Sequence, residues 1–172
     1  MRYYLDTEFN SYKGPLISMS LLRADLESLY MVFPRPNGIT PWVLANVMPY
    51  INSVPNFVKV HRIFHKDAPA LLEEFFKGDD DIEIVVDWPD DMQYLSELLL
   101  TGPGTMINIP RLRFTMERVD AWPLRRLPEP GWGSPVQHNA WWDSWALSEL
   151  FFWQKHATSK HKDGEAEAVA SE

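Results

Sequence analysis

The first strand of the chain constrains both its fold and its chemistry. Aromatic and apolar residues run from Tyr3 to Leu5, as in a buried strand, and carboxylates follow at Asp6 and Glu8. Residues two apart in an extended chain point to the same side, so both acids are expected to project together from the strand end. Clustered carboxylates repel each other and are costly to desolvate, which favours a shared cation. The other interpretation is that the strand ends at Asp6 and the acids are solvated.

The composition is typical of one cytoplasmic domain. The chain has 172 residues, of which 45% are hydrophobic and 13% aromatic. It has no Cys, which excludes disulfides, thiolate metal sites and Cys nucleophiles and favours a reducing compartment. No apolar run reaches about 18 residues and Met1 leads directly into a strand, so we expect neither a membrane span nor a signal peptide. The net charge of −8 disfavours non-specific nucleic-acid binding unless some acids are neutralised as metal ligands.

Hydrophobic periodicity predicts an α/β domain over residues 1–155, followed by a charged tail, 156–172, that we expect to be disordered. We expect Thr40 and Asp67 to cap the first two helices, and residues 50–65 remain unassigned. The strands are expected at residues 2–9, 16–23, 28–33, 82–86 and 111–119, and the helices at 42–48, 67–77, 90–100 and 139–155.

The order of these elements predicts a mixed five-stranded sheet with helices on both faces. Short connections make the first three strands an antiparallel meander, whereas strand-helix-strand crossovers force parallel pairing. The expected strand order is 3-2-1-4-5, with strand 2 antiparallel to the rest. Sites in such sheets form at the carboxyl ends of the parallel strands, where Asp6, Glu8 and Asp87 are expected.

Three motifs in chain order carry a resemblance to a known family. They are Asp6-x-Glu8, Asp87-Trp88-Pro89-Asp90-Asp91, and the stretch His-Asn-Ala-x-x-Asp-Ser-x-Ala-Leu at residues 138–147. The chain resembles the DEDD 3′-to-5′ exonucleases of ribonuclease H-like fold, in the branch where a His precedes the last Asp. Over residues 1–155 it is most similar to the small bacterial and phage exoribonucleases related to ribonuclease T.

The second motif departs from the family pattern. There the strand often ends in Gly-His-Asn, and the metal-binding Asp follows on the next helix with an apolar residue four positions later. Asp91 takes the place of that Asp and Leu95 follows it, while Asp87 replaces the Asn. Asp90 and Asp87 remain alternatives to Asp91 as the ligand.

The resemblance implies a two-metal mechanism with Mg²⁺ or Mn²⁺, which carboxylate and water ligands suit. It implies that Asp6 bridges two ions, that Glu8 holds the ion on the nucleophile side and that Asp91 holds the other. Asp143 completes the metal ligands. His138 is the implied general base, since histidine titrates near neutrality and the Pro/Gly-rich loop before it would let it close on substrate.

The implied partner is the 3′ end of single-stranded RNA or DNA, with RNA favoured by the resemblance alone. Stacking and basic residues usually grip such an end. We expect Phe9 to wedge near the terminal base, Trp88 to flank the acids, and Arg111, Arg113 and Arg118 to track the backbone. The alternatives are that the aromatic residues belong to the core and that the arginines solvate an edge strand. The resemblance further implies a homodimer.

Two other functions fit the same fold. A ribonuclease H-type endonuclease usually lacks the pairing of His138 with Asp143. A catalytically silent module that binds nucleic acid or a protein partner would agree with the acidic net charge and the eight Trp residues. An unused cluster of carboxylates would only destabilise a fold, which favours the enzyme.

Overall fold

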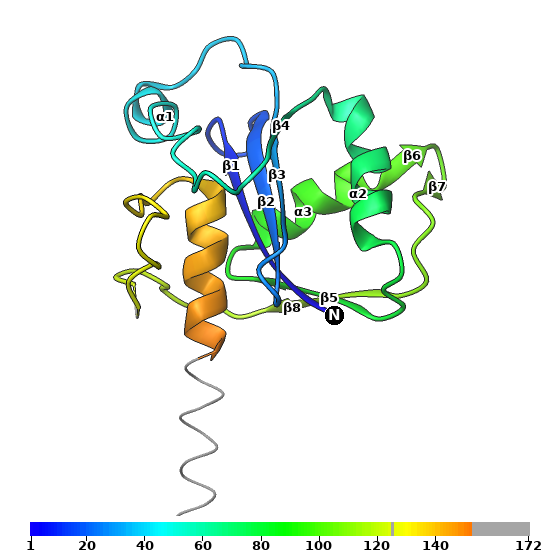
Figure 1. Cartoon of the computed structure of the whole chain (residues 1–172). Coiled ribbons are helices and arrows are strands. Elements are labelled where there is room, and N and C mark those ends of the chain that lie inside the picture. Colours follow the sequence, from blue (N-terminus) through cyan, green and yellow to red (C-terminus); the bar gives the residue numbers. More distant parts are fainter. Residues whose placement is uncertain (125, 153–172) are drawn as a thin grey trace, which may run out of the picture.

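A six-stranded mixed sheet organises the protein (Figure 1). The computed structural model describes residues 1–124 and 126–152. The strand order is β4-β3-β2-β1-β5-β8, with β2 antiparallel to both neighbours and the other pairs parallel. The strands are β1 (Arg2–Phe9), β2 (Leu16–Arg23), β3 (Ser28–Val32), β4 (Val60–Arg62), β5 (Ile82–Val86) and β8 (Leu112–Met116).

The expectation of an α/β fold with a mixed sheet is confirmed, but the expected number of five strands is wrong. The sixth strand, β4, has only three residues, pairs with β3 at the edge, and lies within residues 50–65, for which the sequence predicts no element. A small hairpin of β6 (Leu100–Gly102) and β7 (Thr105–Met106) lies mostly between the helix expected at residues 90–100 and the strand expected at residues 111–119. Both additions are too short to show a hydrophobic period.

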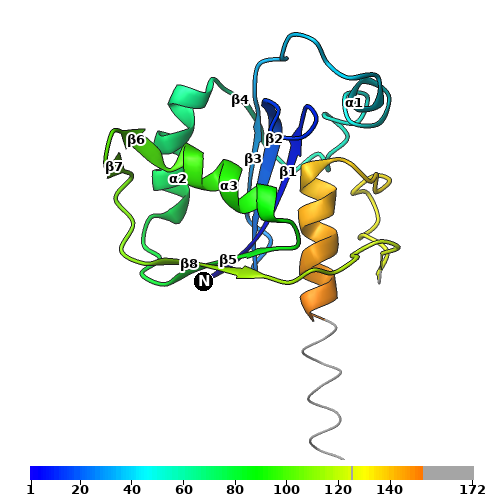
Figure 2. The same cartoon turned by 180° about the vertical axis from the view of Figure 1, so that it is seen from behind.

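Helices cover both faces of the sheet (Figures 1 and 2). One face carries α2 (Ala68–Phe76) and α3 (Pro89–Leu98), and the other carries α1 (Pro41–Asn46) and a C-terminal helix described over residues 140–152. Residues 153–155 of the expected last helix and the tail 156–172 lie outside the described residues. Among the described residues, no helix is long and apolar enough to cross a membrane.

One of the two expected helix caps is correct. Thr40 caps α1 by accepting a hydrogen bond from the backbone N–H of Val43. Asp67 precedes α2, but its side chain makes no capping hydrogen bond. The short 3-10 turn η1 (His65–Asp67) already bends the backbone of Asp67 into a helical conformation, with φ −95° and ψ −14°. A capping side chain needs the extended backbone that Thr40 has.

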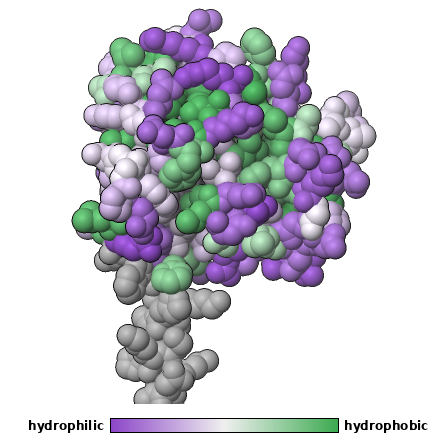
Figure 3. All heavy atoms as spheres, in the orientation of Figure 1, coloured by the Kyte–Doolittle hydropathy of each residue, from purple (hydrophilic) through white to green (hydrophobic). Residues whose placement is uncertain are grey.

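Two apolar clusters sandwich the sheet. Tyr3 and Leu5 of β1 pack toward α2 and α3, whereas Tyr4 packs toward the C-terminal helix, as the alternation of a strand requires. Trp141, Trp142 and Trp145 of that helix are buried in the second cluster and fix the helix on the sheet. At the surface, hydrophobic residues show mainly in hollows between hydrophilic ones (Figure 3).

Candidate metal centre

A cleft of about 1010 Å³ opens beyond the carboxyl ends of β1 and β5. Its lining comes from the end of β1, the start of α1, the connection from β5 to α3, the segment after β8, and the start of the C-terminal helix. Carboxyl ends of parallel strands are where open α/β sheets form their sites, because the chain must leave the sheet there. This is the position expected from the sequence.

The first group of potential metal ligands consists of Glu8, His138 and Asp143, with one ligand atom of each lying within 4.8 Å of the others. Strand alternation explains the contact. Glu8 shares its side of β1 with Tyr4, which packs toward the C-terminal helix. His138 precedes that helix and Asp143 lies in its first turn, so the helix brings both to Glu8.

Asp6, Asp87 and Asp91 form the second group, also within 4.8 Å of one another. The parallel register of β1 and β5 pairs Tyr4 with Val85, and continuing it by two residues sets Asp6 beside Asp87. Asp91 lies in the first turn of α3 and is only 2% exposed. The Thr7 hydroxyl donates to Asp91 Oδ1 over 2.6 Å and fixes its orientation.

The structure discriminates among the three alternatives for the second motif. Asp91 and Asp87 both join Asp6, so the expected ligand Asp91 is accompanied by Asp87. The Asp90 carboxylate turns away and accepts a 2.8 Å hydrogen bond from the indole Nε1 of Trp88. Asp90 also lines the cleft but lies outside both ligand groups.

The start of the C-terminal helix aims His138 into the cleft. Asn139 caps the helix by accepting from the backbone N–H groups of Trp141 and Trp142, at 3.1 and 3.2 Å. His138, just before the cap, has the left-handed φ of 64°, an uncommon conformation that a side chain seldom adopts without support. The ring of Trp42 supplies that support edge-on, with ring centroids 4.9 Å apart.

Asp143 is held by a residue that the sequence patterns did not indicate. The indole Nε1 of Trp122 donates to Asp143 Oδ1 over 2.6 Å. Trp122 lies in the irregular segment between β8 and the C-terminal helix, where no period predicts which side chain reaches the cleft. The indole thereby fixes the orientation of the Asp143 carboxylate, which also hydrogen-bonds to the side chain of Glu8.

Burial dominates the electrostatics of the cluster. It raises the pKa of Asp91 to about 8 and that of Asp143 to about 7, against the lowering effect of the hydrogen bonds from Thr7 and Trp122. Burial and then the neighbouring carboxylates raise the pKa values of Asp6 and Glu8 well above their ordinary ranges. Without added positive charge, the cluster therefore retains protons near neutral pH.

The oxygens in the cluster fit a divalent cation. Asp6 Oδ2 and Asp91 Oδ2 are buried and have no hydrogen-bond partner within the described part of the chain. Buried unpartnered carboxylate oxygens are costly, and a hard cation removes the cost. An oxygen-rich set with one imidazole suits Mg²⁺ or Mn²⁺ better than a thiophilic metal.

Neither a protein-family model nor a curated protein matches the chain. The chemistry of the cleft therefore rests on its own residues. Two groups of residues that could each hold a metal ion lie at one opening, and a histidine belongs to one of them.

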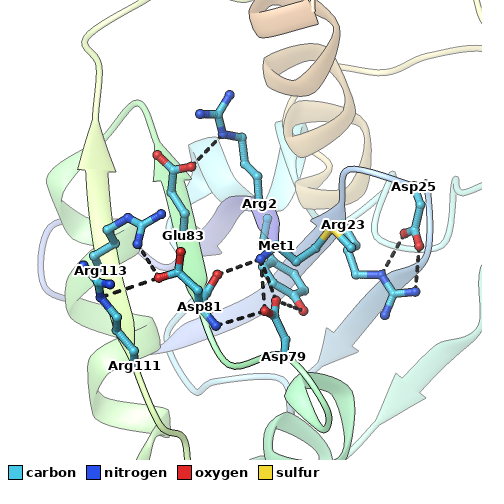
Figure 4. Close-up of polar contacts among 10 residues, drawn as sticks. Met1, Arg2, Arg23, Asp25, Asp79, Asp81, Glu83, Arg111 and Arg113 are labelled. Carbon is cyan, nitrogen blue, oxygen red and sulfur yellow. Dashed lines mark hydrogen bonds and ion pairs between the residues drawn. The ribbon is translucent and has the colours of Figure 1, made fainter.

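The substrate-contact residues expected from the sequence separate into two places. Phe9 and Trp88 line the cleft, although Phe9 also packs against Tyr94 in a tilted arrangement with ring centroids 5.0 Å apart. Arg111 and Arg113 do not line it. Both pair with Asp81 at the amino ends of β5 and β8, with 3.5 Å between Arg111 Nε and Asp81 Oδ1 (Figure 4). These two arginines belong to an ion-pair network at the strand ends opposite the acids, so their expected contact with the substrate backbone stays a prediction that their position does not support.

Proposed function

We propose that the protein is a metal-dependent 3′-to-5′ exonuclease that hydrolyses single-stranded nucleic acid, with RNA preferred over DNA. The observation that carries the proposal is the convergence of Asp6, Glu8, Asp91 and Asp143, from three separate parts of the chain, with His138 in one cleft. These are the residues that the resemblance to the DEDD exonucleases implies.

The two ligand groups suggest how the residues divide their work. Asp6, Asp87 and Asp91 would hold one ion, while Glu8 and Asp143 would hold the other. Asp6 and Glu8 lie two residues apart in β1 and belong to different ligand groups. Asp6 is therefore suited to bridge the two ions. When bound, the ions activate the attacking water and stabilise the leaving oxygen.

His138 is suited to accept the proton of the attacking water. Burial lowers its pKa below the ordinary 6.5, so the imidazole is neutral and able to accept at neutral pH. The water oxygen forms a bond to the terminal phosphorus and its proton passes to a ring nitrogen. The bond to the 3′ oxygen of the preceding nucleotide breaks, and that oxygen takes a proton from solvent. The products are a nucleoside 5′-monophosphate and a chain one nucleotide shorter.

The architecture supports a ribonuclease H-like fold. The meander of β3, β2 and β1 continues into the parallel strands β5 and β8, with helices on both faces and the acids at the carboxyl ends. The edge strand β4 is an addition to the five strands of that arrangement.

A silent binding module is the second candidate, and the buried charges disfavour it. The pKa values of Asp143 and Asp91 are raised to about 7 and about 8, so ionisation of these carboxylates lowers the stability of the fold. Only a bound cation would offset that loss. An endonuclease would use the same ions, and product size separates it from the exonuclease.

The test uses single-stranded RNA and the matching DNA, both labelled at the 5′ end, with Mg²⁺, with Mn²⁺ and with chelator. We expect a ladder that shortens from the 3′ end, requires metal, and is lost in Asp6→Asn and His138→Ala. Arg111→Ala, at the far end of the sheet, serves as the folded control. Intact substrate with pure wild-type protein in both metals would contradict the proposal.

A further inference from the structure

Trp88 and Arg118 form a stacked pair at the mouth of the cleft. The guanidinium carbon of Arg118 lies 4.1 Å from the centre of the Trp88 ring. The strand register explains the pairing: Val86 of β5 lies beside Met116 of β8, and each of the two residues lies two positions further on. Both side chains are exposed and both line the cleft that holds the acids.

Asp90 fixes the platform under the arginine. Its carboxylate accepts from Trp88 Nε1 over 2.8 Å, so the indole ring cannot turn freely. Trp88 is still 43% exposed, although the hydrogen bond holds it in place. A planar guanidinium stacked on a fixed indole is pre-oriented in a way that a lysine ammonium is not.

The hydrogen-bond donors of Arg118 are uncommitted. Within the described residues its side chain makes no hydrogen bond and no ion pair, whereas Arg111 and Arg113 are both paired with Asp81. This is unexpected in a cleft whose described lining includes seven carboxylates. The guanidinium stacks on Trp88 and makes no hydrogen bond to the acids of the described lining, so its five N–H donors remain available to an anion.

Arg118 is also the one permanently charged cation in the described lining of the cleft. The remaining surfaces suited to a nucleic acid strand there are aromatic: Tyr12 is 79% and Trp42 is 54% exposed. Base stacking tolerates any sequence and needs no positive charge. Binding of a strand in the cleft therefore depends on aromatic side chains and on one phosphate contact.

We infer that Arg118, held flat on Trp88, binds a single phosphate of the substrate, and that the affinity of the cleft for a single strand consequently gains little from nucleotides beyond the first few. The inference rests on the proposed function for the chemistry that follows binding. Each further phosphate of a longer strand meets a protein of net charge −8 and gains no matching cation in the cleft. Affinity therefore stops rising after the first few nucleotides.

A second cavity, of about 820 Å³, is where a long strand could find further cations. It lies beyond Gly14 at the turn between β1 and β2, and its lining includes Lys13, His65 and Lys66 together with Glu73 and Glu97. If long strands were preferred, this is where additional phosphates would find cations. Lys66→Ala therefore tests the alternative, and Arg111→Ala controls for loss of one positive charge outside both cavities.

The experiment measures binding of fluorescent single-stranded RNA of roughly 3, 6, 12 and 24 nucleotides by anisotropy with Mn²⁺. The His138→Ala background keeps every carboxylate and slows hydrolysis. We expect dissociation constants within about threefold across the series, and a slope of log affinity against log salt near −0.7, since each single-strand phosphate contributes about that much. Arg118→Ala should weaken binding of all lengths at least about tenfold, as loss of a charged hydrogen bond does.

Substitutions of Trp88 test whether its ring orients Arg118. Trp88→Phe keeps a ring under the guanidinium and should bind within about threefold of the parent, whereas Trp88→Ala should resemble Arg118→Ala. Arg118→Lys keeps the charge, and its affinity should lie between those of Trp88→Phe and Trp88→Ala.

Affinity that rises steadily with length, with a salt slope steeper than about −2 and sensitivity to Lys66→Ala, would overturn the inference while leaving the exonuclease intact. Length-independent binding that depends on Arg118, together with no hydrolysis by the wild-type protein, would support the phosphate contact and refute the proposed function. Absence of binding at every length would refute both.

Discussion

Replacing Asp91 by Asn tests separately how much the acid cluster lowers the stability of the metal-free protein and whether it binds metal. Asn is nearly isosteric and keeps an oxygen that accepts from Thr7 Oγ1, now 2.6 Å from Asp91 Oδ1. It removes the carboxylate oxygen Oδ2, which is buried without a hydrogen-bond partner in the described structure. The substitution should therefore stabilise the metal-free protein and abolish its response to metal.

The magnitude follows from the pKa of Asp91, which burial raises from 3.8 to about 8. A raised pKa favours the protonated folded state, so the stability from this group is complete below about pH 4 and is lost as pH rises to about 8. The loss is about 1.4 kcal/mol per pH unit, or on the order of 4 kcal/mol between about pH 5 and pH 8. For a chain of this size, that corresponds to roughly 10 °C in melting temperature.

The assay is thermal unfolding in chelator and in Mn²⁺ at several pH values. In chelator, Asp91→Asn should melt progressively above wild type as pH rises from about 5 to about 8. In Mn²⁺, wild type should gain about 3 kcal/mol at a concentration near 100 times the dissociation constant, and the variant should gain little. The matched control is Asp90→Asn, which removes the adjacent carboxylate that lies outside both ligand groups. A variant that is less stable than wild type in chelator at about pH 8, or that keeps the full metal response, would refute the reasoning.

Three further predictions test individual residues. His138→Ala should lower kcat by about 10²–10⁴-fold and keep the rise in melting temperature with Mn²⁺. Because burial lowers the pKa of the His138 imidazole, the acidic limb of the wild-type pH–rate profile should lie below pH 6.5, and this limb should vanish in the variant. Trp122→Phe keeps a ring but loses the 2.6 Å hydrogen bond to Asp143, so calorimetry should show metal affinity reduced by about 10-fold or more; unchanged affinity would mean that the indole does not orient the ligand. Asn139→Ala removes the helix cap and the 2.7 Å bond from its Nδ2 to the Tyr50 carbonyl, and should cost about 2–3 kcal/mol in urea unfolding, whereas Asn46→Ala on the exposed α1 should cost much less.

The features that could be predicted from the sequence follow from strand parity and strand order. Alternation in β1 places Asp6 and Glu8 on the face of Tyr4 and leaves Thr7 for the other face, where Asp91 meets it. Crossover connections place β5 beside β1 and so bring Asp87 to the same opening. These are local rules, and they hold because the strands are buried on both faces.

The features that could not be predicted lie where no period operates. Arg113 lies in β8 and Arg111 just before it, as the alternation predicts, but alternation fixes the face of a residue and says nothing about which strand end carries the site. Trp122 reaches Asp143 from irregular chain, and only the folded path brings it there. Arg118 is expected from the sequence to contact the substrate backbone, but its stacking on Trp88 depends on the pairing of β5 with β8, which places the two residues equally far beyond their strands.

The central claim is that the cleft removes one nucleotide at a time from a 3′ end. The most direct measurement is the identity of the first product from a single-stranded RNA carrying its label on the 3′-terminal nucleotide, resolved by chromatography with Mg²⁺ and with chelator. The account predicts labelled nucleoside 5′-monophosphate from the first time point, and none in chelator or with Asp6→Asn. Labelled oligonucleotides as the first product would indicate internal cleavage, and the absence of any metal-dependent product would contradict the exonuclease altogether.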